Sequence, residues 1–312
     1  MKHKVGGQVN FNLSLKFFSK KSQINLKKAF SFIEISVVIL IVAVTLIGVM
    51  QGQEMYYKMR LNSARLLTEK TDLGMIDGLK VWLEATTAKS FDNGQMVDST
   101  KISKWVNLYS TPFAKFDFSQ PTVALQPKYY QNAINGLPAV RFDNAQTLST
   151  SSLYINDFAS NQEVTIFLVQ QSYSSSYSSA YPFCWMSGSI PTTTMLLTNT
   201  KALGKITFYF GSFSNILQTS IQLNFLNKNN ILTYYKSSAN VGIRLNRASL
   251  ISGASTQTIS DTAYTSLSLG GCHQRTGYFF YGHIGEFIVF NRALNNSEID
   301  LVEKYLSEKW GI

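Results

Sequence analysis

Cysteine and histidine are scarce in this 312-residue chain, which holds two cysteines and three histidines. Beyond residue 29 the only histidines are His273 and His283, and neither lies in the His-Glu-x-x-His spacing of zinc peptidases. The Gly-x-Ser-x-Gly sequence of serine hydrolases is also absent. The chain therefore lacks the sequence signatures of metallopeptidases and of serine hydrolases.

The two cysteines, Cys184 and Cys272, allow at most one disulfide within the chain. Both lie in the part that is expected outside the cytoplasm, where disulfides form and persist. The sequence does not show whether their Cα atoms come close enough to pair. The alternatives are a disulfide between Cys184 and Cys272 and two small residues of the core.

Proline is absent before Pro112, so no proline interrupts a helix in the first third of the chain. Residues 30–50 are predominantly apolar, and as a helix these 21 residues would span about 31 Å, enough to cross the hydrocarbon core of a bilayer. The helix can continue beyond the membrane, where Glu54 and Lys58 have the i,i+4 spacing of an ion pair. The sequence predicts a transmembrane helix that continues as a helical stalk over residues 51–76.

Acidic residues are fewer than basic ones, 18 against 28, which gives a formal net charge of +10. Residues 1–29 hold seven lysines and no acidic residue, so 21 basic and 18 acidic residues remain beyond them, a net charge of +3. No basic patch typical of a nucleic-acid-binding domain is left, and nucleic acid is not an expected partner. Lysines before an apolar helix stay on the cytoplasmic side, which places the C-terminal part across the membrane.

A short polar segment, Lys27-Lys28-Ala29-Phe30-Ser31-Phe32-Ile33-Glu34, leads directly into the apolar residues. Inserting a charged side chain into a membrane costs roughly 2.5–3.5 kcal/mol at the centre of a transmembrane helix and less near its end. The presence of Glu34 in this segment therefore needs an explanation. One reason is a position at the membrane interface, from which the carboxylate reaches water.

The same segment resembles the processing site of type IV prepilins and of the related pseudopilins of type II secretion. The resemblance implies that a membrane-embedded prepilin peptidase cuts between Ala29 and Phe30 and methylates the new N-terminus on Phe30. It also implies that Glu34, the fifth residue after the cut, pairs with the N-terminus of a neighbouring subunit and guides filament docking. Two features depart from the family: Ala29 stands where glycine is usual, and the 29-residue leader is long.

From Asp77 onward short β-rich runs alternate with polar turns. The clearest runs are residues 164–169, 206–210, 221–226, 231–235 and 278–290. Many short strands in one stretch predict a single all-β sandwich.

The end of the chain carries a helix signal. Asn295 and Glu298 have the spacing of a capping box. Apolar residues then recur at helical spacing: Ile299, Val302, Leu306 and Trp310. The sequence therefore predicts a short amphipathic C-terminal helix that packs on the sandwich.

Three passages stand out in order along this domain. They are residues 77–85 (DGLKVWLEA), 132–143 (NAINGLPAVRFD) and 282–294 (GHIGEFIVFNRAL), the last running on to KWGI at the end of the chain, with Trp105 between the first two. Together they resemble the laminin-G-like, concanavalin A-like jelly-roll family of bacterial surface proteins. The resemblance implies two antiparallel sheets, often with sugar or protein bound on a concave face or at the loop rim.

An enzyme is not expected. Glycoside hydrolases with sandwiches of this shape need two carboxylates about 5–10 Å apart. Glu286 is the best strand-borne carboxylate, but it has no acidic partner two or four residues away. A buried hydrogen bond or ion pair is the more natural role for Glu286.

Two kinds of small ligand stay open. Asp92-Asn93-Gly94 and Asp143-Asn144 offer hard oxygen ligands for calcium, the only cofactor that the sequence suggests, although such pairs also form plain turns. Loop-like tyrosines offer stacking surfaces for sugar: Tyr129, Tyr130, Tyr173 and Tyr177. Core or hairpin packing explains the first two equally well.

The whole sequence predicts a pilin-like subunit, a minor pilin or a pseudopilin, with four segments. They are a cleaved cytoplasmic leader (1–29), a transmembrane and filament-core helix (30–50), a helical stalk (51–76) and a laminin-G-like jelly-roll head (77–312). The expected partners are a prepilin peptidase, other pilin or pseudopilin subunits, the inner membrane, and a carbohydrate or protein ligand of the head.

The expected location is the bacterial inner membrane, with a single pass and the head in the periplasm, and after assembly a pilus at the cell surface. One alternative is a type II secretion pseudopilin that recognises an exported protein. Another is an uncleaved single-pass membrane protein with a carbohydrate-binding domain.

Overall fold

The computed structural model describes residues 31–92, 94–109, 116–143, 145–150, 163–173, 179–186, 196–201, 205–210, 212–219, 226–255, 266–271 and 279–312. The chain divides into two compact units, Met1–Gly52 and Gln53–Ile312. A boundary at this point falls within one continuous helix.

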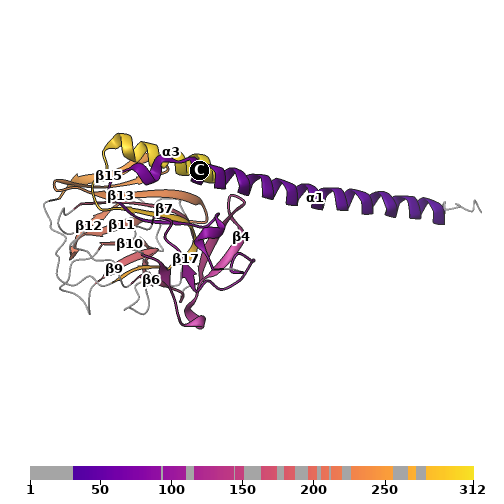
Figure 1. Cartoon of the computed structure of the whole chain (residues 1–312), viewed down its shortest axis with the longest axis horizontal. Coiled ribbons are helices and arrows are strands. Elements are labelled where there is room, and N and C mark those ends of the chain that lie inside the picture. Colours follow the sequence, from indigo (N-terminus) through magenta and orange to yellow (C-terminus); the bar gives the residue numbers. More distant parts are fainter. Residues whose placement is uncertain are drawn as a thin grey trace, which may run out of the picture. The chain divides into compact units, whose positions relative to one another are not determined.

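That helix, α1 (Phe32–Lys70), has 39 residues (Figure 1). It begins where the backbone oxygen of Ser31 accepts the first helical hydrogen bond, from Ile35, and no proline interrupts it. It is followed by the short 3-10 helix η1 (Asp72–Met75), whose N-cap Thr71 accepts a hydrogen bond from the backbone of Leu73. The long N-terminal helix that the sequence predicts is confirmed.

The rest of the chain is an antiparallel β-sandwich, as the sequence predicts. Two more 3-10 turns, η2 (Ala88–Ser90) and η3 (Val123–Leu125), lie in its connections. Its strands are β1 (Leu79–Glu84), β2 (Lys104–Trp105), β3 (Phe118–Ser119), β4 (Lys128–Ile134), β5 (Leu137–Asp143), β6 (Leu148–Thr150), β7 (Val164–Ser172), β8 (Ser179–Ala180), β9 (Phe183–Met186), β10 (Leu196–Lys201), β11 (Ile206–Phe210), β12 (Ser212–Gln218), β13 (Asn229–Lys236), β14 (Asn240–Leu245), β15 (Ala248–Ala254), β16 (Ser266–Leu269) and β17 (Tyr281–Phe290).

The strands form two sheets. The first has the order β15-β14-β13-β7-β17-β5-β4, and the second has the order β12-β11-β10-β9-β16-β6-β3-β2, with β8 beside β10. One edge of β17 changes partner, because β5 pairs with its first residues and β1 with its last. Of the strands expected from sequence, only the run at 221–226 falls almost entirely outside the described residues.

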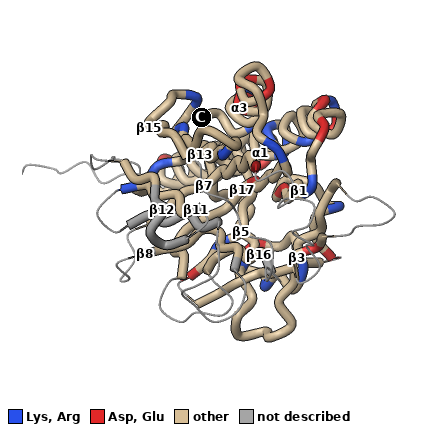
Figure 2. The backbone as a smooth tube through the Cα atoms, turned by 90° about the vertical axis from the view of Figure 1, so that its left-hand side faces the viewer, with Lys and Arg blue, Asp and Glu red and all other residues tan. Residues whose placement is uncertain are grey.

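The central strands of the first sheet, β13, β7 and β17, are buried on both faces. Alternate residues of β7 show this: Ile166 and Leu168 belong to the core between the two sheets, whereas Phe167 and Val169 belong to a second core beneath the helices. Figure 2 shows α1 and α3 on one side of β13, β7 and β17, with β11, β12 and β16 on the other. A strand that is covered on both sides reads as a continuous apolar run, as residues 164–169 do.

The C-terminal helix is α3 (Asn296–Trp310). Asn295 and Glu298 form the predicted capping box, and Gly311 ends the helix in the left-handed conformation with φ of 67°. The four residues of the predicted apolar face are all buried: Ile299, Val302, Leu306 and Trp310. The predicted amphipathic helix and its packing on the sandwich are confirmed.

The second half of α1 is part of the head. Leu61, Ala64 and Thr68 are buried there. Arg65 Nε donates to the backbone oxygen of Thr86 over 2.8 Å, and the hydroxyl groups of Thr68 and Tyr305 lie 3.4 Å apart. The segment that the sequence suggests as a stalk is therefore packed against the sandwich over these turns.

Candidate functional site

The N-terminal end of α1 contains the residue on which the docking hypothesis depends. Ala29 and Phe30 lie outside the described residues, whereas Glu34 lies in the first turn of the helix. Its Oε2 accepts a hydrogen bond of 2.8 Å from the backbone of Ser31, and Ser31 Oγ accepts one of 3.4 Å from Ile33. The bond to Glu34 is one half of a capping box, while Ser31 Oγ caps the backbone of Ile33 instead of that of Glu34.

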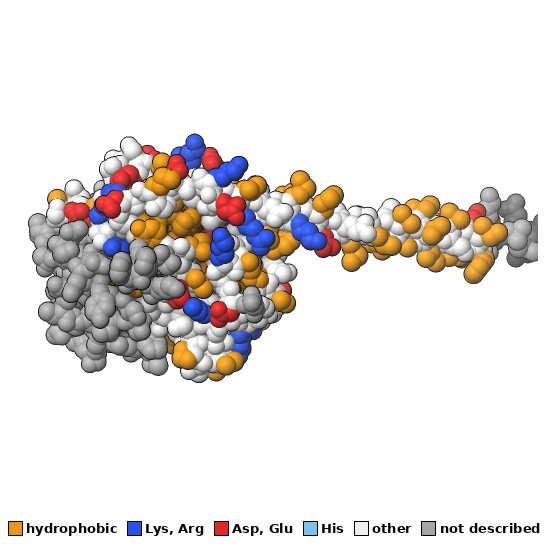
Figure 3. All heavy atoms as spheres, in the orientation of Figure 1, with side chains coloured by type: hydrophobic (Ala, Val, Ile, Leu, Met, Phe, Trp, Pro, Cys, Tyr) orange, Lys and Arg blue, Asp and Glu red, His pale blue; other side chains and the backbone are white. Residues whose placement is uncertain are grey.

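The turns of α1 that follow carry an uninterrupted apolar surface. Every described residue of this segment up to Gly52 is exposed, and the large apolar side chains range from 47% exposed for Ile35 to 85% for Phe32 (Figure 3). The helix is long and apolar enough to cross a membrane. Large exposed apolar surfaces of this kind mark contacts with membranes or with other proteins.

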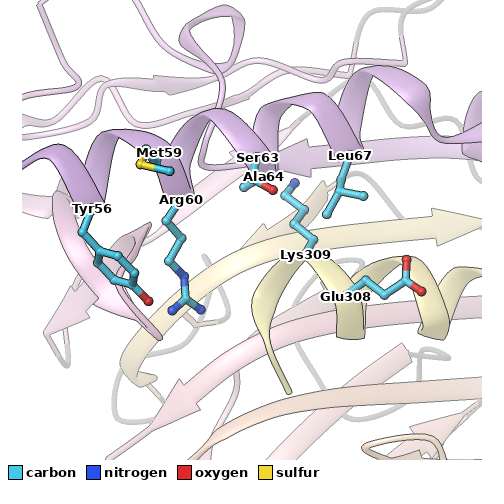
Figure 4. Close-up of a pocket in the computed structure, with 8 residues that line it drawn as sticks. All are labelled: Tyr56, Met59, Arg60, Ser63, Ala64, Leu67, Glu308 and Lys309. Atoms are coloured by element: carbon cyan, nitrogen blue, oxygen red, sulfur yellow. The ribbon is translucent and has the colours of Figure 1, made fainter.

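Grooves run along the second half of α1. One has a volume of about 360 Å³. Its lining residues are drawn in Figure 4: Tyr56, Met59, Arg60, Ser63, Ala64 and Leu67 of α1, and Glu308 and Lys309 of α3. Another, of about 410 Å³, lies between the start of this segment and the turn that joins β4 to β5. The first mixes apolar side chains with the Arg60 guanidinium and the Glu308 carboxylate, and its lining residues include no pair of carboxylates and no histidine.

An aromatic and basic cluster lies at one end of the first sheet, with Arg141 on β5, Tyr281 on β17 and Tyr173 directly after β7. The guanidinium carbon of Arg141 is 4.6 Å from the ring centres of both Tyr173 and Tyr281. Arg141 Nε also donates to Asp143 Oδ1 over 2.6 Å. Cation–π contacts and an ion pair thus hold the guanidinium in one orientation, and its side chain keeps 17% of its surface exposed.

His283 lies beside this cluster and is 6% exposed. Its ring centre is 5.6 Å from those of Tyr130 and Tyr173, both edge-on, and its Nδ1 is 3.1 Å from the Tyr173 hydroxyl. Burial, and to a smaller extent the neighbouring Arg141 guanidinium, lower the pKa of His283 to about 4, against the opposing effect of Asp143. The imidazole is therefore neutral at pH 7.

The four tyrosines that the sequence suggests for sugar stacking divide between different places. Tyr130 and Tyr173 meet at His283, half-buried. Tyr129 is 1% exposed in the core between the sheets, which agrees with the core-packing alternative. Tyr177 lies outside the described residues. Neighbours on a strand point to opposite faces, which is why Tyr129 and Tyr130 differ.

The structure describes only some of the residues that the sequence suggests as calcium ligands. Asp143 is engaged by Arg141, while Asn93 and Asn144 lie outside the described residues. In the described part of the chain, no group of three or more His, Cys, Asp or Glu side chains is placed to hold a metal ion. Calcium binding stays a prediction.

Glu286 of β17 has the buried role that the sequence suggests. Four side chains donate to its carboxylate over 2.7–2.8 Å: Trp82, Tyr305, Lys309 and Trp310. Sequence reasoning missed its acidic neighbour, because Glu84 comes from the paired strand β1, directly opposite Glu286. Both carboxylates are 0% exposed and both bind Lys309, so this pair is closed to a sugar substrate.

Cys184 lies buried in β9 and is disulfide-bonded. The only other cysteine of the chain, Cys272, lies outside the described residues, so the predicted pairing of the two stays a prediction.

No protein-family profile matches this chain, and no curated protein sequence matches it. Similar solved structures include the CBM40 of the Ruminococcus gnavus IT-sialidase bound to α2,3-sialyllactose, at 14% identity and a TM-score of 0.46 over 53% of this chain and 95% of that one. Domain 4 of AbnA, a GH43 extracellular arabinanase from Geobacillus stearothermophilus in complex with arabinotriose, gives 14% identity and a TM-score of 0.47 over 72% and 98%.

A mutant Trypanosoma rangeli sialidase with trans-sialidase activity gives 12% identity and a TM-score of 0.49 over 75% of this chain and 33% of that one. The match to the Streptococcus pneumoniae NanB sialidase covers only 26% of that longer chain. At these identities and TM-scores the likenesses carry no argument about ligand or activity. The sandwich is established by the strand pairing of this chain itself.

Proposed function

We propose that this chain is a pilin-like subunit, a minor pilin or pseudopilin, that a prepilin peptidase cuts between Ala29 and Phe30 and methylates on Phe30. The observation that carries the proposal is the exposed apolar surface from Phe32 to Met50, with the single carboxylate Glu34 in its first turn. A filament of packed apolar helices buries such a surface after it leaves the bilayer, and Glu34 then guides docking.

The construction of the head supports this proposal. The second half of α1 is bound into the sandwich through Leu61, Ala64 and the Arg65–Thr86 hydrogen bond. The head shares a helix with the segment proposed to cross the membrane. A filament that incorporates this segment would therefore display the head. The head in this proposal is a non-enzymatic recognition or adhesion domain for carbohydrate or protein.

For the ligand face of the head we propose the cluster around Arg141. Its guanidinium and the rings of Tyr130, Tyr173 and Tyr281 combine a fixed cation with aromatic surface, a pairing that suits polar ligands with flat apolar faces, such as sugars. Arg141→Ala is expected to abolish binding of the protein to a glycan array. Lys304→Ala, a change on the exposed side of α3, is expected to leave this binding intact. Equal binding by both variants would remove the cluster from the proposal.

One observation favours a second candidate, a single-pass membrane protein that is never cut. The hydrogen bond from the Ser31 backbone gives Glu34 a partner at the start of its own helix, so no neighbouring subunit is needed to satisfy one of its oxygens. A third candidate, the pseudopilin of a type II secretion system, shares the processing step and differs in that its head recognises an exported protein.

The deciding experiment is to determine the N-terminus of the membrane-associated protein by mass spectrometry, after isolation from cells with and without the prepilin peptidase. We expect a methylated Phe30 only where the peptidase is present. Ala29→Leu should leave an unprocessed precursor, because a bulky residue replaces the small one before the cut. Ala43→Leu, an equal change inside the helix, should be processed normally. A start at Met1 in both strains would establish the uncleaved anchor instead.

A further inference from the structure

Lys309 of α3 is a buried ammonium that contacts two buried carboxylates. Its Nζ lies 2.6 Å from Glu84 Oε1 and 2.8 Å from Glu286 Oε2, and the three side chains are 0% exposed. The three formal charges leave one negative charge in excess, in surroundings built from Trp82, Tyr305 and Trp310. The amine and the carboxyl group are thus held together without solvent access, a proximity that favours a reaction between them as well as an ion pair.

We propose that Lys309 and Glu84 condense to an amide, an intramolecular isopeptide bond that joins α3 to β1. Glu286 first takes one proton from the Lys309 ammonium, which leaves a neutral amine. The nitrogen lone pair then forms a bond to Cδ of Glu84. The C–O bond breaks, and the leaving oxygen departs as water with the proton returned by Glu286 and a second proton from the nitrogen.

The reaction balances without a further reagent. One ammonium and one carboxylate become one amide and one water molecule, and Glu286 ends as the carboxylate it was. No oxidant, nucleotide or metal takes part. Condensation also removes one pair of buried charges, whose desolvation is unfavourable in a dry interior.

Glu84 is the better acyl acceptor because hydrogen-bond donors hold both of its oxygens. The backbone and hydroxyl groups of Thr86 donate to Oε1, and the backbone of Thr87 donates to Oε2 over 2.9 Å. Negative charge that develops on the Glu84 oxygen during attack is stabilised by these fixed donors, as in an oxyanion hole. Arg65 donates to the backbone oxygen of Thr86 and so fixes this loop from α1.

Glu286 is the better proton carrier because it is held by side chains that do not react. Indole N–H groups of Trp82 and Trp310 donate to its two oxygens, and the Tyr305 hydroxyl donates to Oε1 over 2.8 Å. Its Oε2 stays within 2.8 Å of the amine. The same aromatic side chains keep the site dry, which protects the amide from hydrolysis.

The bond would link residues 225 positions apart. It would close nearly the whole sandwich into a covalent loop and hold α3, which packs on the second half of α1, to the sheet. This consequence does not depend on whether the chain is processed or assembles into filaments.

The test is the mass of the full chain, purified in detergent, reduced and denatured, with its N-terminus determined separately. We expect the wild-type mass to be smaller than that of its sequence by one water molecule, and a protease digest to contain one branched peptide joining Glu84 and Lys309. Lys309→Arg should have its full mass. Glu286→Gln should also stay unlinked, because its amide cannot accept the proton. Lys304→Arg, on the exposed side of the same helix, should keep the link.

A wild-type chain of full mass after prolonged incubation would overturn the proposal, whatever the variants do. A branch between Lys309 and Glu286 would overturn the assignment of Glu84 as acceptor. Full linkage in Glu286→Gln would overturn its role as proton carrier. Because the wild-type mass decides the main question, a variant that fails to fold does not obscure the result.

Discussion

Trp310, the last residue of α3, occupies the space where a side chain at Gly285 would lie. A Cβ atom built on Gly285 would stand 2.5 Å from the end of the indole ring. Gly285 is also the point where β17 changes register between Ile284 and Glu286, and where its edge passes from β5 to β1. The C-terminal helix therefore packs closely on the sheet at the position where β17 changes register.

Gly285→Ala is expected to lower the free energy of unfolding by about 2 kcal/mol, because the added methyl group forces Trp310 or the strand to move. The measurement is the denaturant midpoint of the full chain in detergent, followed by tryptophan fluorescence. Gly74→Ala is the matched control, since its Cβ meets no atom within 4 Å and the change should be within about 0.5 kcal/mol of neutral. Equal midpoints for both variants would contradict the packing argument.

Glu34→Gln separates the two roles of this residue. Glutamine can complete a capping box but carries no charge. If Glu34 pairs with a positive N-terminus in the filament, the glutamine variant should be processed like the wild type yet be lost from sheared filaments. Glu34→Ala removes both the cap and the charge and serves as the comparison. Wild-type incorporation of the glutamine variant would show that capping is the role of Glu34.

His283 makes the stability of the head depend on pH. Its pKa is about 4 in the folded protein and 6.5 in an unperturbed chain, so the unfolded state binds the proton more readily between these values. The neutral ring makes its full contribution to the free energy of unfolding above pH 6.5. This contribution falls by up to about 3 kcal/mol as the pH drops to 4.

His283→Gln should therefore have a smaller difference between its denaturant midpoints at pH 7 and pH 4.5 than the wild type. Comparing differences cancels the titration of carboxylates elsewhere in the chain. An unchanged difference would show that His283 titrates normally in the folded protein.

The buried carboxylate of Glu303 holds α3 to β13 and β14. It accepts hydrogen bonds of 2.7 Å from Thr233 and of 2.9 and 2.8 Å from Arg244. Glu303→Ala should destabilise the fold by about 3 kcal/mol, because it leaves the half-buried guanidinium with only Asp300 as a charged partner. Glu308→Ala, which breaks an exposed contact of 3.9 Å to Lys304, should change stability by less than about 1 kcal/mol. Thermal unfolding of both variants distinguishes these outcomes.

Local patterns were sufficient for the features whose causes lie within one turn or one strand. The Asn295–Glu298 capping box and the apolar face of α3 follow from spacing alone, as does the β-rich run of β7. The spacing Ser31-x-x-Glu34 also predicts the hydrogen bond between the Ser31 backbone and Glu34, while the docking role of Glu34 stays a prediction. Tyr129 and Tyr130 could not be told apart, because which side of the strand faces the core depends on the partner sheet.

The sequence by itself determined a long uninterrupted helix, an all-β domain and a capped C-terminal helix, because periodicity, proline placement and end signals act over a few residues. Only the tertiary structure placed Glu84 beside Glu286 and Lys309, since β-strand register brings together residues that are more than 200 positions apart. It also decided that the second half of α1 belongs to the head. Helical propensity makes that segment a helix, whereas its burial depends on the shape of the surface against which it packs.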